Sequence, residues 1–230
     1  SRLVVAGRMD AFRSELARAM RWGFLLTIPS TIGLMMLAEP IMSVLYQHGK
    51  FTAQEASQAA GALRFYAIGL AGYAALKVLV NAFYALERRK TPMMVSILAV
   101  GLNLLLNWIF TFRLGWGHRG LAFSTGCIAT FNFLLLYLLM QTQLKGLESG
   151  RLLVLLGKLA LAGVALVAVC AAGSHWLLAD WPTQTLLIKL AGLLATVIVG
   201  AVSFAGCGVL LHIEEVKELS DALQRRLKRR

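Results

Sequence analysis

The sequence contains few charged residues for its length. Of its 230 residues, 15% are Asp, Glu, Lys or Arg and 58% are hydrophobic, whereas a soluble domain has roughly 25% charged and about 45–50% apolar residues. The charges are grouped in short clusters, and the stretches between the clusters are long and apolar. This distribution excludes an ordinary soluble domain and predicts a protein with several membrane-spanning segments.

Residues that commonly perform catalysis or bind metals are also scarce. Cys127, Cys170 and Cys207 each lie in an apolar run, without CxxC or Cys/His spacing. We expect them to pack between helices rather than to bind a metal or form a disulfide. The four histidines are scattered, and the sequence has no suitably spaced acidic pair, phosphate-binding loop or nucleophile motif. These absences predict that the chain is not an enzyme.

Six apolar stretches are long enough to cross a bilayer, which takes roughly 20 helical residues for about 30 Å. They comprise residues 22–46, 62–86, 93–112, 120–140, 152–178 and 185–211. The connections between them are short, so neighbouring helices are expected to run antiparallel. The predicted fold is therefore all-α, a polytopic transmembrane bundle of six helices.

The distribution of basic residues predicts the orientation of the bundle. The net charge is +12, and 17 of the 23 Lys and Arg residues lie at the two termini and in alternate loops. The positive-inside rule then places both termini in the cytoplasm. Because no basic stripe is interleaved with exposed aromatic residues, we expect anionic membrane lipids rather than nucleic acid to be the partners.

The chain divides into five parts by composition. They are a basic, amphipathic cytoplasmic lead-in (1–21), four helices (22–140), a cytoplasmic linker (141–151), two helices almost without internal polar groups (152–211) and a basic tail (212–230). The polar lead-in, which begins without Met, suggests a piece of a longer protein. The amphipathic tail from Ile213 onwards either lies on the inner leaflet or is solvated.

Ionisable residues inside a predicted span are candidates for function, because charge in hydrocarbon is costly. Lys77 lies near the middle of the second span, with Asn81 one turn later on the same face. A lysine facing an aqueous cavity would bind an anionic substrate group, whereas the alternative is a lysine that snorkels or pairs with an acid. Glu39 differs from Lys77 in depth by roughly 10 Å, which favours a position near the outer interface over a direct pair.

Two further features concern the first, third and fourth spans. Pro29 and Pro40 are both expected to interrupt the first helix. Asn103 and Asn107 share a face of the third span, and the fourth carries several hydroxyl and amide residues, among them Thr125. Their oxygens either ligate a small hard cation such as Na⁺ or form hydrogen bonds between the helices.

Several of these stretches resemble consecutive helices of the MurJ (MviN) lipid II flippase family, within the multidrug/oligosaccharidyl-lipid/polysaccharide exporter superfamily. The matching strings are Pro29–Ser30, residues 37–41 and 47–52, residues 77–86 with Arg89, Thr91 and Pro92, Asn103 with Asn107, and residues 120–125. The resemblance covers most of the chain and rests on the order and spacing of these strings together.

The resemblance implies that the chain is the carboxyl-terminal portion, helices nine to fourteen, of a fourteen-helix fold. In this family two six-helix lobes enclose a cavity whose arginines bind the lipid pyrophosphate, and helices thirteen and fourteen form a groove for the polyprenyl tail. Lys77 and Asn81 are then candidates for the cavity wall, and residues 152–211 for the groove. The amino-terminal lobe would be a missing partner.

A sodium site from helices seven, eleven and twelve is also implied, and Asn103, Asn107 and Thr125 fall close to the matching positions. Some members carry Asp where Asn107 stands, and the loss of that charge weakens cation binding. The implied function is translocation of lipid II, the undecaprenyl-linked peptidoglycan precursor, across the bacterial inner membrane by alternating access for cell wall synthesis. The alternatives are a related exporter of O-antigen, polysaccharide or drugs, and a membrane scaffold without transport activity.

Overall fold

The computed structural model describes residues 8–46, 52–144, 146–176 and 186–219, and these residues are almost entirely helical. Its elements are α2 (Met9–Met36), α3 (Ala38–Tyr46), α4 (Ala53–Ala85), α5 (Lys90–Trp108), the π-helical turn η1 (Ile109–Arg113), α6 (Gly117–Gln143), α7 (Ser149–Trp176) and α8 (Leu186–Leu210). Within the described residues, five helices are long and apolar enough to cross a membrane, and the count rises to six when the bent pair α2–α3 is taken as one span. The predicted all-α bundle is confirmed.

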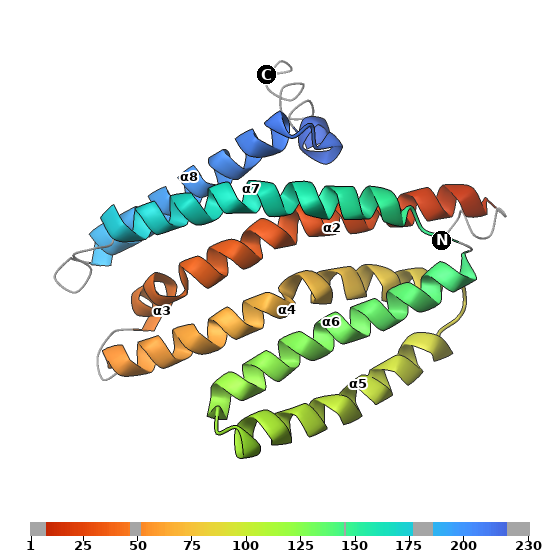
Figure 1. Ribbon diagram of the computed structural model, residues 1–230, viewed down its shortest axis with the longest axis horizontal. Helices are drawn as coiled ribbons and strands as arrows, with labels where there is room; N and C mark the ends of the chain where they lie inside the picture. The colour runs from red at the N-terminus through yellow and green to blue at the C-terminus, as the bar shows by residue number, and fades with distance from the viewer. Residues whose placement is uncertain (1–7, 47–51, 145, 177–185, 220–230) are drawn as a thin grey trace.

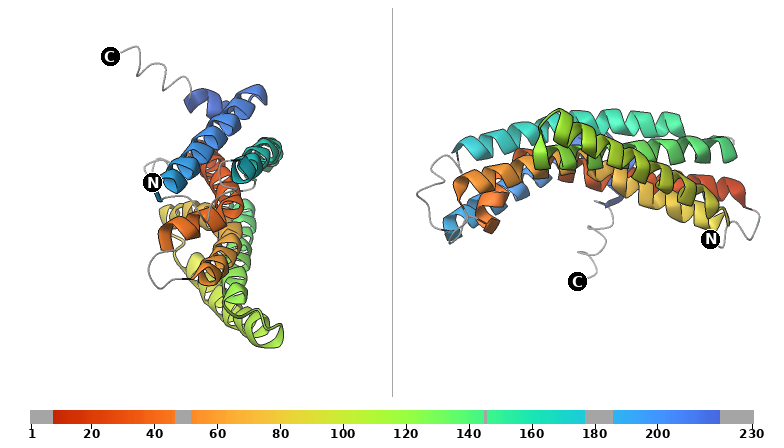
Figure 2. Two further views of the ribbon diagram at one scale, coloured as in Figure 1. Left: turned by 90° about the vertical axis from the view of Figure 1, so that its left-hand side faces the viewer. Right: turned by 90° about the horizontal axis from the view of Figure 1, so that it is seen from below.

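The helices form a row rather than a closed ring. Packing contacts connect them in the order α8, α7, α2, α4, α6 and α5 (Figure 1), and the two further views show the row as a curved slab (Figure 2). Helix α6 lies next to α5 at one edge of the row, whereas α7 lies on the other side of α2. The connection from α6 to α7 therefore passes the start of α2 (Figure 1). Helices α2 and α7 begin, and α6 ends, on the same side of the slab (Figure 1). We call this side the basic end, because Arg18 and Arg21 lie in the first half of α2 and Arg151 lies in the first turn of α7.

The first predicted span is two helices that meet at an angle of 72°. Pro40 has no N–H to donate to the Met36 carbonyl, and its ring would clash with that carbonyl in a continuous helix. The break at Leu37 follows from this restriction. Pro29 behaves differently: it lies inside the continuous helix α2, so the prediction that both prolines interrupt the helix is wrong for Pro29.

Two other boundaries differ from those predicted. Residues 9–21 of the predicted lead-in are the first turns of α2, which continues without a break into the apolar span. Helix α4 begins at Ala53 instead of residue 62 because Thr52 and Glu55 form a capping box. In this motif the Glu55 N–H donates to Thr52 Oγ1 at 3.3 Å, while the Thr52 N–H donates to the Glu55 carboxylate at 2.8 Å. The residues before Arg64 therefore extend α4 by more than two turns beyond the predicted span.

Candidate substrate cavity wall and lipid groove

One face of α4 carries a row of exposed polar and aromatic side chains. Tyr73, Lys77 and Asn81 are four residues apart and Tyr84 follows three later, a spacing that places all four on one side of the helix. The opposite side is buried, with Leu79 and Phe83 fully covered, because α4 packs between α2 and α6. We call Tyr73, Lys77, Asn81 and Tyr84 the polar stripe. The prediction that Lys77 and Asn81 share a face is consistent with this arrangement.

The ammonium group of Lys77 is positioned by an aromatic ring and not by an acid. Its Nζ lies 5.1 Å from the centroid of the Tyr73 ring, and among the described residues no carboxylate pairs with it. Glu39 is bound instead to Arg64, with Nη2 to Oε1 at 3.1 Å, and Arg64 Nε also donates to the Met35 carbonyl. Arg64 is roughly 20 Å from Lys77 along α4 at 1.5 Å per residue. The positive charge of Lys77 is therefore available to an anionic ligand.

The asparagines of α5 form a hydrogen-bonded network with α6. Asn107 Nδ2 donates to Asn103 Oδ1 at 3.0 Å, and the Ser124 hydroxyl donates to Asn107 Oδ1. Ser124 is fully buried. The structure thus brings Asn103 and Asn107 together and adds Ser124, which the sequence offered only as one of several polar residues on its helix.

Thr125 lies outside this network. Its side chain is exposed, and its hydroxyl donates to the Leu121 carbonyl of its own helix at 2.8 Å. Asn103, Asn107 and Ser124 have neutral oxygens suited to a hard monovalent cation, but these oxygens take part in hydrogen bonds among the three residues. In the described part of the chain no cluster of three or more His, Cys, Asp or Glu side chains is placed to hold a metal ion. The sodium site stays a prediction.

An apolar groove lies on the other side of α2 from the polar stripe. Its volume is about 590 Å³, and it is bounded by α2, α3, α7, α8 and residues 213–219. Its walls are almost wholly hydrocarbon, from residues such as Leu25, Pro29, Leu37, Leu166, Ala201 and Phe204. The Ser30 hydroxyl, which also borders it, donates to the Leu26 carbonyl and so presents no free donor. Such a groove accepts a hydrocarbon chain and disfavours a polar ligand.

Sequence reasoning missed two parts of this arrangement. It assigned the groove to the last two helices alone, whereas α2 and α3 supply much of its wall. It also missed Arg64 as the partner of Glu39. Two signals in the sequence mark the helix ends that bring this pair together. They are Pro40, which directly follows Glu39, and the Thr52–Glu55 capping box, which precedes Arg64.

Comparisons with known proteins relate most of the chain to one family of membrane proteins. The sequence model of the family described as "Lipid II flippase MurJ" matches residues 1–192. The chain is 32% identical over 196 residues to a protein of Rickettsia prowazekii described as "Probable lipid II flippase MurJ", covering 85% of this chain and 38% of that relative. A protein of Burkholderia cenocepacia, "Lipid II flippase MurJ", is 37% identical over 134 residues, covering 56% of this chain and 26% of the relative.

A solved structure titled "Lipid II flippase MurJ, inward closed conformation" has the same fold. It superposes with a TM-score of 0.65 at 22% sequence identity, covering 86% of this chain and 40% of that one. The chain thus spans well under half the length of these relatives. Because the family model covers more than four-fifths of its residues, this membrane protein belongs to the MurJ lipid II flippase family.

Proposed function

We propose that these helices form the carboxyl-terminal part of a flippase that moves lipid II from the inner to the outer leaflet of the bacterial inner membrane. Lipid II combines an anionic pyrophosphate headgroup with a long polyprenyl chain. The observation that carries the proposal is that one row of helices presents the Lys77 ammonium, which pairs with no carboxylate among the described residues, on one side of α2 and an apolar groove on the other. The protein is then a transporter of the peptidoglycan precursor and not an enzyme.

The polar stripe is the part that contacts the headgroup. The Lys77 ammonium attracts the pyrophosphate, Asn81 donates hydrogen bonds to it, and the neighbouring tyrosines offer ring faces and hydroxyls to the saccharide. The chain spans about 40% of the length of these relatives, and in the intact flippase rocking of a second lobe against this one would expose the stripe to each side of the membrane in turn. Meanwhile the polyprenyl chain stays in hydrocarbon along the groove.

The charge distribution supports placing the basic end in the cytoplasm. Basic residues lie in the segments that meet at this end: Arg18 and Arg21 in the first half of α2, Arg88 and Arg89 between α4 and α5, and Arg151 in the first turn of α7. Anionic lipids and the positive-inside rule favour such clusters on the cytoplasmic side. Both ends of the chain then face the cytoplasm.

The polar stripe gives less support to a drug exporter. A cavity for cationic drugs requires carboxylates, and none of the four stripe residues is acidic. Glu39 is neutralised by Arg64.

Replacing Lys77 with alanine in the intact flippase tests the headgroup role. A charge-assisted contact to a phosphate is worth about 1.5–3 kcal/mol, so flipping should fall roughly tenfold or more. The measurement is the rate at which lipid II becomes accessible on the far side of proteoliposomes, together with growth of cells that depend on the variant.

Arg113→Ala is the matched control for this substitution. Like Lys77, Arg113 is an exposed cation over an aromatic ring, since its Cζ lies 5.6 Å from the centroid of the Trp108 ring. It does not belong to the polar stripe. Its loss should leave flipping close to that of the unchanged protein. Normal flipping and growth in Lys77→Ala would refute the cavity role of Lys77.

Filling the groove tests the proposed path of the lipid chain. The phenylalanine of Ala201→Phe would project into the groove, whereas that of the neighbouring Val202→Phe would point away from it, since Val202 is 67% exposed and is not part of the wall. Flipping is expected to fall in the first variant and to persist in the second, when both are measured in the same proteoliposome assay. Equal rates in the two variants would show that the chain takes another route.

A further inference from the structure

The segment after α8 makes a turn and packs against the bundle. His212 adopts a left-handed backbone conformation with φ of 52°, and the Ile213 N–H donates to the Gly208 carbonyl at 3.0 Å. Lys158 of α7 fastens this turn by donating from Nζ to the His212 carbonyl at 3.0 Å. The chain therefore turns at His212, and residues 213–219 lie against α2 and α8.

Residues 213–219 pack closely against the bundle and border the apolar groove. Ile213 is 1% exposed and Val216 is 6% exposed. Val216 approaches α8 at Gly208, where a Cβ atom would lie only 2.9 Å from Val216 Cγ2. Val216 and Leu219 border the groove together with Leu25 of α2. They lie near Leu25, which is the first residue of α2 to border the groove.

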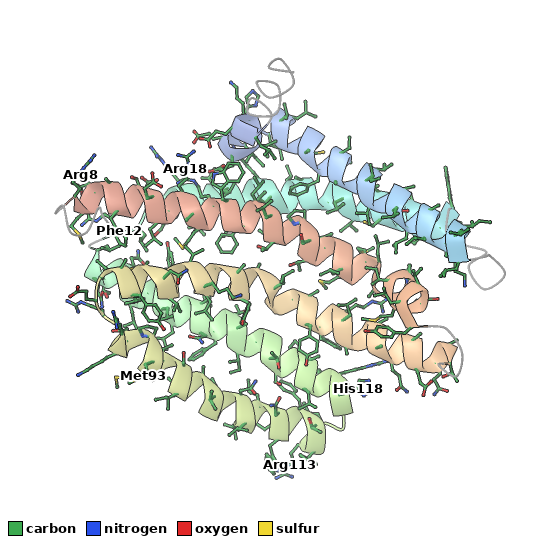
Figure 3. The ribbon with its side chains drawn as sticks, turned by 180° about the vertical axis from the view of Figure 1, so that it is seen from behind. Arg8, Phe12, Arg18, Met93, Arg113 and His118 are labelled. Carbon is green, nitrogen blue, oxygen red and sulfur yellow. The ribbon has the colours of Figure 1, made fainter. Side chains whose placement is uncertain are left out.

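Two ion pairs fasten the segment to α2. Arg21 Nε donates to Glu215 Oε1 at 2.6 Å, and Arg18 Nη2 donates to Glu218 Oε2 at 2.9 Å. The two arginines are three residues apart, as are the two glutamates, so the pairs match turn by turn. The first pair is largely buried, whereas both members of the second are half-exposed. Figure 3 shows Arg18 on the side of α2 that faces this segment.

We propose that residues 213–219 are a strap that closes the basic end of the groove and must release from α2 to admit a long hydrocarbon chain. A chain longer than the groove has to leave it at an end, and Val216 and Leu219 obstruct this one. The ion pairs favour the closed strap, while the lipid chain favours the open one by burying its surface along the groove. This inference rests on the proposed function, because it assigns the groove to the polyprenyl chain.

The test locks the strap reversibly. In the intact protein Cys127, Cys170 and Cys207 are replaced with alanine, and Arg18→Cys with Glu218→Cys provides two accessible thiols. A short bifunctional methanethiosulfonate reagent joins them, and reductant separates them. The readout is labelling of the groove by a photoreactive polyprenyl phosphate in vesicles of phosphatidylethanolamine and phosphatidylglycerol. We expect the crosslink to lower labelling about tenfold or more and reductant to restore it.

Asp10→Cys with Arg13→Cys is the matched control, because this exposed pair also lies on α2 but does not involve the strap. A second variant, Glu218→Gln, removes only the half-exposed ion pair and should speed labelling without any crosslinker. Labelling that is unchanged by complete crosslinking, that falls equally in the control, or that is absent in every state overturns the strap. If labelling follows the crosslink but lipid II is never flipped, the strap stands and the proposed transport fails.

Discussion

Replacing Arg21 with methionine is expected to lower the free energy of unfolding by about 3 kcal/mol, because it leaves a buried carboxylate without its partner. Glu215 has a side chain only 7% exposed, and Arg21 lies 2.6 Å from it. Arg21 also reaches Glu148 in the connection between α6 and α7 at 3.2 Å. One side chain thus joins α2 to two segments that are distant in the sequence. Unfolding of the purified protein in mixed micelles measures the loss.

Arg13→Met is the control for this substitution. Arg13 is paired with Asp10, whose carboxylate is 97% exposed, so the change should cost less than about 1 kcal/mol. A second comparison adds Glu215→Leu to Arg21→Met, and this double variant should recover part of the loss because no buried charge remains unpaired. Glu148 stays more exposed and keeps Arg151 as a partner. Equal stability of the Arg21 and Arg13 variants would contradict the expected role of Arg21.

The positions of the spans could be predicted because hydropathy is a local property. All six apolar stretches lie within described helices or overlap them closely, and the errors occur at helix ends. The start of α4 was predicted too late, because the polar residues after Thr52 do not look membrane-embedded and only the capping box indicates that they are helical. Pro29 was misjudged for a different reason: within a packed helix the freed carbonyl does not by itself require a break.

The candidate site could be predicted only where it depends on one helix. The shared face of Lys77 and Asn81 and the pair Asn103–Asn107 follow from a spacing of four residues. The contact of Ser124 with Asn107, the packing of α7 beside α2 and the Arg21–Glu215 pair join residues far apart along the chain. Their sequence positions carry no periodicity that relates one segment to the other. For the same reason the groove wall from α2 and α3 could not be inferred.

These non-local contacts also explain how the row of helices can present two different surfaces. Helix α2 separates the polar stripe of α4 from the apolar groove beside α7 and α8. Its basic end is fixed by Arg18 and Arg21, while its other end bends at Leu37. The packing of α4 against α6, on which the orientation of the stripe depends, is therefore as important to the proposed function as the stripe residues themselves.

Substituting Gly69 with alanine is expected to destabilise this packing by about 3 kcal/mol, because the added methyl group meets backbone and not a flexible side chain. An ideal Cβ at Gly69 would lie 2.5 Å from the Cα of Gly126 on α6. The next close approach, of Gly72 to Thr130, is also tight, at 3.1 Å from the Thr130 Cα. Small residues at such positions let membrane helices pack closely. Unfolding in mixed micelles measures the effect on stability.

Gly101→Ala makes the same chemical change where the space around the helix is open. Apart from its chain neighbours and the nearby backbone of its own helix, no atom of the described residues lies within 4 Å of a Cβ at Gly101. Alanine favours a helix over glycine by about 1 kcal/mol, so this variant should be unchanged or slightly more stable. The two substitutions are therefore expected to act in opposite directions. If Gly69→Ala is as stable as Gly101→Ala, then α4 and α6 do not meet at Gly69 and Gly126. The polar stripe would in that case face a different direction, and the assignment of Lys77 to the cavity wall would fail with it.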